Sequence, residues 1–292
     1  MHGGLAPFQT LVMPLSVETQ LAITRHRARK DVERALASPP DPPLRWWRRE
    51  AEESSGGRPS GGAPLASSGA PPLASSGGAL RVGVISSDFG DHPVGHALLP
   101  WVRALTRRPG LELLCFASDS SERSHAGEPL RRELAASCTS FVDVTDLSDA
   151  ETARTISDHR PHLLLNLVGH TAGSRHVVTQ WQPAPVQAMH YGYPGTTALP
   201  AIGYMQVDSV AVPPPMHRDF TERLAYFPHS HFVAVHSVRY RHVAARTTHA
   251  HPWLPDGAAP AHAGGGRANP DRFAVDSAGD RVRRGDLGLG RF

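Results

Sequence analysis

The stretch LRVGVISSDFGDHP, residues 80–93, changes from an apolar run into a polar loop. An apolar, β-branched run that stops at polar residues and glycine is typical of a buried strand entering a loop. Pro93 suits the first turn of a following helix, because a proline there loses no hydrogen bond. In open α/β sheets, ligands bind in such loops at the carboxyl ends of strands. We therefore expect Asp88 and His92, a carboxylate and an imidazole four residues apart, to lie at a ligand site beside a helix N-terminus that favours anions.

Strand-like and helix-like segments alternate downstream of this loop. The strand-like segments are 81–86, 111–117, 140–144, 162–168 and 185–191, and the helix-like segments are 93–107, 126–137, 148–159 and 174–181. Alternation of this kind predicts a parallel sheet with helices on both faces. The run LLLNLV at 163–168 supports it, since a strand buried on both faces is apolar almost throughout. The fold class predicted for residues 80–237 is therefore α/β, with one Rossmann-like lobe.

Three other regions flank this predicted lobe. Residues 1–40 contain a helical pattern for which Ser16 is a suitable N-cap. Residues 41–79 are rich in Gly, Ser and Pro and contain a near-repeat of APLASSG, which predicts a disordered linker. Residues 238–292 lose all periodicity, and we expect a mostly disordered tail with a short helix near 280–287.

Composition narrows the class of protein. The chain has 292 residues and a formal net charge of +3, a balance that does not require nucleic acid as a partner. No apolar run reaches the ~20 residues of a membrane-spanning helix, and the first residues lack a signal-peptide pattern. The two cysteines, Cys115 and Cys138, form no CxxC motif and no disulfide framework, which favours a reducing compartment. We therefore expect a cytoplasmic or nuclear protein without nucleic acid or membrane partners.

Two further polar loops follow predicted strands. GHTAGSR at 169–175 carries Thr171 and Arg175, which can meet an anionic or hydroxylated ligand, and its glycines allow close backbone approach. GYPGTT at 192–197 follows the next strand. Because the carboxyl ends of parallel strands share one edge of a sheet, these loops converge with the 86–92 loop on one site. The alternative for each loop is an ordinary turn, with Asp88 as a turn cap.

Two histidine pairs have spacings that could suit a metal. His92 and His96 are four residues apart, but Pro93 puts His92 at the helix cap rather than on the helix face. His229 and His231 would share one face of an extended segment, but no third ligand is evident. No metal site is predicted.

Four motifs, in this order, resemble the amino-terminal lobe of the catalytic region of the protein O-linked N-acetylglucosamine transferases. They are LRVGVISSDFGDHPVGH (80–96), LLLNLVGHTAGSR (163–175), PAPVQAMHYGYPGTT (183–197) and ERLAYFPHSHFV (222–233). The family also contains SPINDLY-type O-fucosyltransferases. The SSDFGDHP loop is more similar to the N-acetylglucosamine branch.

The resemblance implies a GT-B architecture, in which the donor lies between two Rossmann-like lobes. It implies an inverting transfer of N-acetylglucosamine from UDP-N-acetylglucosamine to Ser or Thr hydroxyls of intracellular proteins, with no cofactor and no metal. Matching positions suggest Asp88 and His92 in the reaction centre, with Pro93 close to the acceptor and the sugar. The remaining matching positions would line the cleft or border the sugar pocket: Thr171, Arg175, Tyr191 and Gly192.

The chain also departs from the family pattern. Tetratricopeptide repeats do not precede the lobe, and the second lobe, with its lysine near the diphosphate, has no counterpart in the sequence. Lys30 is the only lysine, and it lies in the upstream helix. Within the loops, His170 replaces a usual tyrosine, Ala172 a usual lysine and Gly203 a usual aspartate.

These departures bear on activity. The diphosphate leaving group needs cationic or dipolar stabilisation, so we expect this chain alone to transfer little or no sugar. The first hypothesis is a truncated record of a full glycosyltransferase. The second is a non-catalytic binding or regulatory lobe derived from the same family, and the third is a small-molecule enzyme that uses Asp88 and His92.

Overall fold

The computed structural model describes residues 6–48, 78–118 and 128–232, together with the backbone of 274–275 and 281–282. The chain divides into two compact units, residues 1–238 and 239–292. In the second unit the described backbone forms two short antiparallel strands, β8 (Ala274–Val275) and β9 (Arg281–Val282). The short helix expected near 280–287 is therefore wrong at β9, where the backbone is extended.

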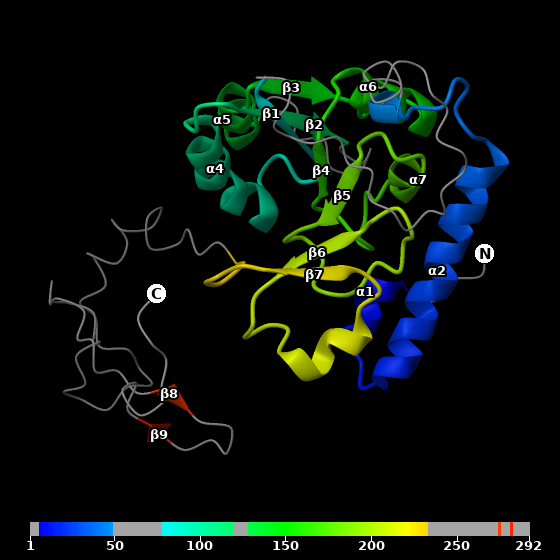
Figure 1. The fold of residues 1–292 in the computed structure, drawn as a ribbon, viewed down its shortest axis with the longest axis vertical. Helices are drawn as coiled ribbons and strands as arrows, with labels where there is room; N and C mark the ends of the chain where they lie inside the picture. The colour runs from blue at the N-terminus through cyan, green and yellow to red at the C-terminus, as the bar shows by residue number, and fades with distance from the viewer. Residues whose placement is uncertain (1–5, 49–77, 119–127, 233–273, 276–280, 283–292) are drawn as a thin grey trace, which may run out of the picture. The chain divides into compact units, whose positions relative to one another are not determined.

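One parallel sheet forms the centre of the first unit (Figure 1). Its strands within the described residues are β1 (Leu80–Ser86), β2 (Leu111–Ala117), β3 (Ser140–Asp143), β4 (Leu163–Asn166), β5 (Val186–Met189), β6 (Tyr204–Val207) and β7 (Arg223–Tyr226). Their order is β3-β2-β1-β4-β5-β6-β7, and each neighbouring pair is parallel. The order reverses between β1 and β4, which is the point where doubly wound sheets bind ligands.

Helices cover both faces of this sheet. They are α1 (Pro7–Thr10), α2 (Val17–Ala37), α4 (Pro93–Thr106), α5 (Pro129–Ser137), α6 (Asp149–Asp158) and α7 (His176–Gln180), with a 3-10 turn, η1 (Pro214–Asp219). Figure 1 shows α4 and α5 on one face and α6, α7 and α2 on the other. The strands and helices predicted between 81 and 191 are present with small shifts at their ends, whereas β6 and β7 were not predicted.

Alternating side chains of the central strands fill two separate cores. In β1, Val82 and Val84 pack with α4 and α5, whereas Ile85 packs with α6 and α7. In β2, Leu113 and Phe116 divide between the two cores in the same way. Both strands are therefore buried on both faces, which explains their nearly continuous apolar sequence.

The chain before β1 packs onto the face that carries α6 and α7. The Trp181 indole N–H donates to the Ala35 carbonyl at 2.8 Å, and the Ser157 hydroxyl donates to the Leu44 carbonyl at 2.7 Å. Leu44 and Trp46 are both 4% exposed. The linker predicted for 41–79 therefore starts too early, because 41–48 belong to the packed unit. Residues 49–77 of that predicted linker lie outside the described residues, as does the tail apart from β8 and β9.

The two cysteines are joined in a disulfide. Cys115 lies in β2, and Cys138 is the residue that ends α5. The sequence-based expectation of unpaired cysteines is therefore wrong. The prediction failed because it relied on motif spacing, whereas the α5–β3 connection brings two residues 23 positions apart into bonding distance.

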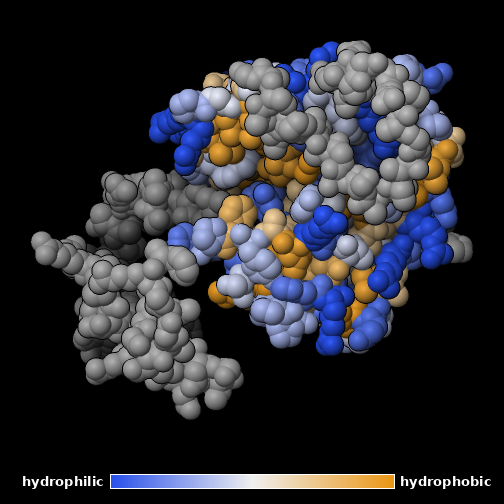
Figure 2. Space-filling view, in the orientation of Figure 1, coloured by the Kyte–Doolittle hydropathy of each residue, from blue (hydrophilic) through white to orange (hydrophobic). Residues whose placement is uncertain are grey.

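The surface of the described residues mixes polar and apolar side chains. The outer side of α2, along the right of Figure 2, is mostly hydrophilic. Among the described residues, no helix is both long enough and apolar enough to cross a membrane.

Glycines allow the loops at the carboxyl edge of the sheet to approach one another closely. A Cβ atom at Gly192 would lie 1.7 Å from the Leu167 carbonyl oxygen, so the loop after β5 contacts the loop after β4 through bare backbone. A Cβ at Gly95, in the first turn of α4, would lie 2.2 Å from the Gly90 carbonyl oxygen. No side chain fits in either place without movement of the backbone.

We expect Gly192→Ala to lower the free energy of unfolding by about 3 kcal/mol or more, because the added methyl group meets backbone that cannot rotate away. Gly203→Ala is the matched control, since a Cβ at Gly203 meets nothing closer than the Gln187 carbonyl oxygen at 4.0 Å. Urea unfolding of both variants measures the difference. Equal stability of the two variants would contradict the close contact at Gly192.

Candidate functional site

Three polar loops meet at the carboxyl edge of the sheet, as the sequence predicted. The loops after β1 and β4 flank the point where the strand order reverses. They touch through the Ser87 hydroxyl, which donates to the Ala172 carbonyl at 3.4 Å. The loop after β5 joins them through Gly192 and through Gly169, where a Cβ would lie 2.3 Å from the Tyr193 Cβ. This edge is the candidate site.

Asp88 and His92 lie side by side in the loop between β1 and α4. His92 Nδ1 is 3.6 Å from Asp88 Oδ2, and the Asp88 side chain is 5% exposed against 31% for His92. The backbone N–H of Asp88 donates to the Ser86 hydroxyl at 3.1 Å, which fixes the start of the loop. The predicted carboxylate–imidazole pair therefore exists, with the carboxylate buried and the imidazole partly open to solvent.

His92 is also the N-cap of α4. Its Nδ1 accepts a hydrogen bond from the Val94 N–H at 3.2 Å, so this nitrogen carries a lone pair and the proton of the neutral ring is on Nε2. Nδ1 is also the ring nitrogen that lies 3.6 Å from Oδ2 of the Asp88 carboxylate. An imidazole beside a carboxylate is a pair that can take part in proton transfer.

Two further predicted residues lie at the same edge of the sheet. Pro93 is the first residue of α4 and is exposed beside His92. Thr171 lies in the loop after β4, where its hydroxyl donates to the Val168 carbonyl at 2.8 Å and keeps its acceptor lone pairs. The two residues follow β1 and β4, the strands between which the strand order reverses.

Arg175, which was predicted to line the cleft, is held by hydrogen bonds to another loop. Its Nε donates to Asp149 Oδ1 at 2.8 Å, and its terminal nitrogens donate to the carbonyls of Val144 at 2.9 Å and Leu147 at 2.7 Å. The side chain is 16% exposed. These bonds attach the start of α7 to the loop between β3 and α6. The sequence could not show this, because the partners come from another loop.

Tyr191 and Gly192 begin the loop after β5. Tyr191 has a positive φ of 63° and stacks on Phe232, with ring centroids 4.9 Å apart. Burial raises the pKa of the Tyr191 hydroxyl, so it stays a hydrogen-bond donor at neutral pH. His190 contacts Tyr191 and Phe227 at centroid distances of 5.9 and 5.8 Å. The site therefore has an aromatic border, which the sequence predicted only at Tyr191.

Glu222 was not singled out as a site residue, yet it secures the loop after β5. It directly precedes β7 and is 6% exposed. Its carboxylate accepts hydrogen bonds from the Thr197 N–H at 2.7 Å, the Thr196 hydroxyl at 2.6 Å and the Thr197 hydroxyl. Its place in the ERLAYFPHSHFV motif is the only sequence signal that could have pointed to it.

The histidine pairs considered for metal binding have acidic partners instead. His96 Nε2 is 2.7 Å from Asp91 Oδ1, and His231 Nδ1 is 2.6 Å from Asp208 Oδ2. Hydrogen bonds from the backbone N–H groups of Ala211 and His231 lower the pKa of Asp208, so it is ionised.

Comparison with known proteins agrees with this geometry. The model of Glycosyl transferase family 41 matches residues 68–253. The chain belongs to glycosyltransferase family 41. The prediction made from the four motifs is confirmed at this level, and so is the Rossmann-like lobe of a GT-B enzyme.

The similar curated proteins and a similar solved structure are named as N-acetylglucosamine transferases. The chain is 34% identical over 168 residues to a UDP-N-acetylglucosamine–peptide N-acetylglucosaminyltransferase of Caenorhabditis elegans, covering 57% of this chain and 14% of that protein. It is 33% identical over 154 residues to the probable enzyme SEC of Arabidopsis thaliana, covering 53% and 15%. A mutant of the Thermobaculum terrenum O-GlcNAc transferase matches with a TM-score of 0.50 and 25% identity, covering 77% of this chain and 42% of that chain. The family 41 chain described here thus spans about a seventh of the length of these curated relatives.

Replacing Arg175 should destabilise the fold. We expect Arg175→Ala to lower the free energy of unfolding by about 2–4 kcal/mol, because it leaves the Val144 and Leu147 carbonyls without their donors. Arg218→Ala is the control, since that side chain is 87% exposed. Thermal and urea unfolding measure both. If the two variants have the same free energy of unfolding, the hydrogen bonds of Arg175 do not stabilise the fold.

Acid should destabilise the lobe through His190. Burial, together with the nearby charge of His231, lowers the pKa of His190 from 6.5 to about 4. Because the folded pKa lies below the unfolded one, this contribution to stability is present above pH 6.5 and is lost as pH falls toward 4. Between pH 7 and pH 5, we expect the free energy of unfolding of His190→Phe to fall by about 2 kcal/mol less than that of the wild-type chain.

The control for this experiment is His26→Phe, because His26 is exposed on α2. It should lose as much stability as the wild-type chain over the same pH range. Urea unfolding at a series of pH values gives all three curves. A His190→Phe curve parallel to that of the wild type would show that His190 does not titrate on unfolding.

Proposed function

We propose that this chain is the amino-terminal catalytic lobe of a protein O-GlcNAc transferase, which moves N-acetylglucosamine from UDP-N-acetylglucosamine to Ser or Thr hydroxyls of proteins with inversion. The observation that carries the proposal is the Asp88–His92 pair at the reversal of strand order in a family 41 lobe. The names of the relatives, which transfer N-acetylglucosamine to peptides, support it.

In this proposal His92 and Asp88 form the reaction centre. The acceptor hydroxyl loses its proton as its oxygen attacks the anomeric carbon, and the bond to the UDP oxygen breaks. His92 accepts or relays that proton, and the buried Asp88 carboxylate stabilises the imidazolium. Pro93 and Thr171 lie next to the acceptor and the sugar. The transfer uses no metal and no cofactor.

The loop after β5 supplies the sugar pocket in this proposal. Gly192 lets the backbone approach Leu167, and Tyr191 presents a half-buried ring beside it. Stacking on Phe232 holds that ring in place. A hexose ring packs well on such an aromatic face.

We also propose that the 292-residue chain transfers sugar slowly when alone. The described residues form one Rossmann-like lobe, and a diphosphate leaving group needs cationic or dipolar stabilisation from its surroundings. The only lysine, Lys30, lies in α2. A second lobe would supply the groups that hold UDP.

Donor binding and residual transfer test the proposal together. Saturation-transfer NMR with UDP-N-acetylglucosamine should show contact to the sugar, and prolonged incubation with radiolabelled donor and a Ser/Thr peptide should give trace product. His92→Asn keeps a capping acceptor for α4 but removes the imidazole, so it should lower product by about 100-fold or more. Asp88→Asn should act in the same direction.

The matched control is His96→Asn, one helical turn away, whose ring contacts Asp91 rather than Asp88. It should keep both donor binding and product. GDP-fucose in the same NMR experiment tests the branch of the family. Folded protein that neither contacts a nucleotide sugar nor forms product would refute the catalytic proposal and favour a binding or regulatory lobe.

A further inference from the structure

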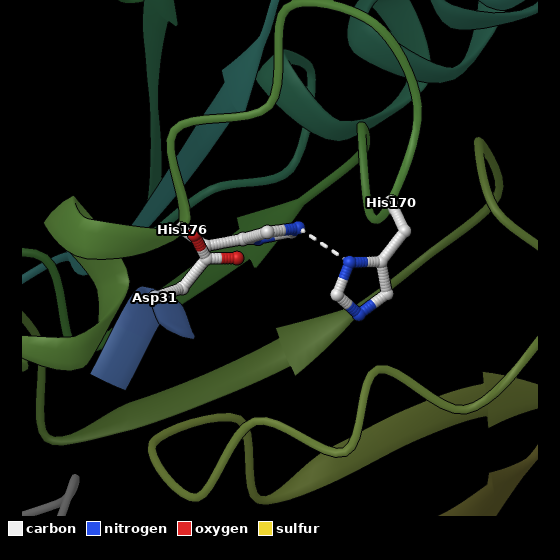
Figure 3. Close-up of side chains that lie close together, drawn as sticks. All are labelled: Asp31, His170 and His176. Atoms are coloured by element: carbon white, nitrogen blue, oxygen red, sulfur yellow. Dashed lines mark hydrogen bonds between the residues drawn. The ribbon is translucent and has the colours of Figure 1, made fainter. Parts of the chain in front are cut away.

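Three ionisable side chains from separate parts of the chain meet in the interior beside the candidate site. Asp31 comes from α2, His170 from the loop after β4, and His176 from the first residue of α7 (Figure 3). Each offers one ligand atom, and these atoms all lie within 4.8 Å of one another. The three residues are 1%, 5% and 2% exposed.

The hydrogen bonds around this cluster fix the protons of both rings. His170 Nε2 is 2.7 Å from the Thr197 carbonyl, which can only accept, so Nε2 carries the proton and Nδ1 carries a lone pair. His176 Nε2 is 3.1 Å from that Nδ1 and must donate to it. The remaining nitrogen, His176 Nδ1, is therefore an unprotonated acceptor.

Two buried atoms of this cluster make no hydrogen bond among the described residues. They are His176 Nδ1 and Asp31 Oδ2, of which Oδ2 has only an ion-pair contact, to Arg27 Nε at 3.5 Å. A buried polar atom without a hydrogen bond is costly, and the cost is greater for an oxygen of a charged carboxylate. A cation bound here would contact that oxygen.

We infer that Asp31, His170 and His176 form a structural binding site for a divalent transition metal, of which Zn²⁺ is the best match. Two imidazoles and one carboxylate are a common ligand set for Zn²⁺, with water as the fourth ligand. The inference does not rest on the proposed function, because the site lies apart from Asp88 and His92.

The geometry is close to that of a tetrahedral site. Ligand bonds of about 2.0–2.1 Å to nitrogen put two ligand atoms about 3.3 Å apart. His176 Nε2 and His170 Nδ1 are already 3.1 Å apart. A metal held by both would replace the hydrogen bond between them, and the His176 proton would then be on Nδ1. The hydrogen bond from His170 Nε2–H to a backbone carbonyl is the outer contact that orients metal-binding histidines. The Asp31 ligand atom lies within 4.8 Å of both nitrogens.

Two arginines compete with a metal for Asp31. Arg27 Nε lies 3.5 Å from Asp31 Oδ2, and Arg34 lies 2.5 Å from Oδ1. Their side chains are 50% and 63% exposed, so both guanidinium groups can turn into water when a cation takes the carboxylate. Burial lowers the pKa of both histidine rings, so a second proton does not compete with a metal for them.

A metal here would connect α2 to the loop after β4. That loop carries Thr171 and touches the loop after β1 through Ser87. Zn²⁺ would therefore rigidify the lobe around the candidate site without contacting the reacting groups.

Titration of the metal-free 292-residue chain with Co²⁺ and Zn²⁺ tests the inference. The wild-type chain should bind one tight equivalent of Co²⁺, with the visible absorption of a tetrahedral site, and Zn²⁺ should displace it and raise Tm. Asp31→Asn and His170→Tyr each remove one ligand. Asparagine has nearly the same size as aspartate, and tyrosine is the residue usual in the family at position 170. Each should weaken binding by more than about 100-fold, beyond the loss seen for outer contacts.

His190→Phe is the control, because it removes a buried histidine outside the cluster. It should keep the tight site and the rise in Tm. Circular dichroism confirms that each variant is folded. If the wild-type chain and the folded Asp31→Asn and His170→Tyr variants take up Co²⁺ equally, the metal site does not exist and the bound ions belong to other histidines.

Discussion

The Leu167 carbonyl oxygen lies where a side chain at position 192 would stand, and the arrangement of the site depends on this contact. It holds the loop after β5 against the end of β4, while Gly95 lets α4 close onto the loop after β1 in the same manner. Backbone-to-backbone contacts do not change with rotamers. The loops therefore keep one relative position, and the side chains they carry inherit it.

In the Asp88–His92 pair, one residue has both a structural role and a proposed chemical one. His92 ends the loop as the N-cap of α4, so its ring is positioned by the helix rather than by solvent. The same bond assigns the lone pair to Nδ1, the nitrogen nearer to Asp88. Under the proposed function, a proton arriving at Nδ1 would replace the capping hydrogen bond by an ion pair with a buried carboxylate.

The parts of the fold that could be predicted from the sequence are those that local patterns determine. The apolar runs of β1, β2 and β4 and the proline at the start of α4 specified the lobe, and the alternation of strands and helices predicted the parallel sheet. β6 and β7 were not predicted because each is only four residues long and neither is an apolar run, with Gln206 within β6 and Arg223 at the start of β7. The hydrogen bonds of Arg175 could not be predicted, because its partners lie in and next to the loop between β3 and α6. The packing of Leu44 was hidden by the adjacent Gly- and Ser-rich stretch.

The cluster of Asp31, His170 and His176 could not be predicted either, because it depends on contacts between distant parts of the sequence. Asp31 lies 139 positions before His170 in the sequence, and only the packing of α2 against α7 brings them together. At position 170 the family resemblance led us to expect tyrosine, and a phenol there could bond the Thr197 carbonyl but could not accept the proton of His176 as imidazole Nδ1 does. The two histidines and the aspartate therefore form one unit: with His170 alone, the pocket would be an ordinary hydrogen-bonded core. With all three it concentrates lone pairs and negative charge, and this favours a cation over a proton because one ion can contact all three groups at once.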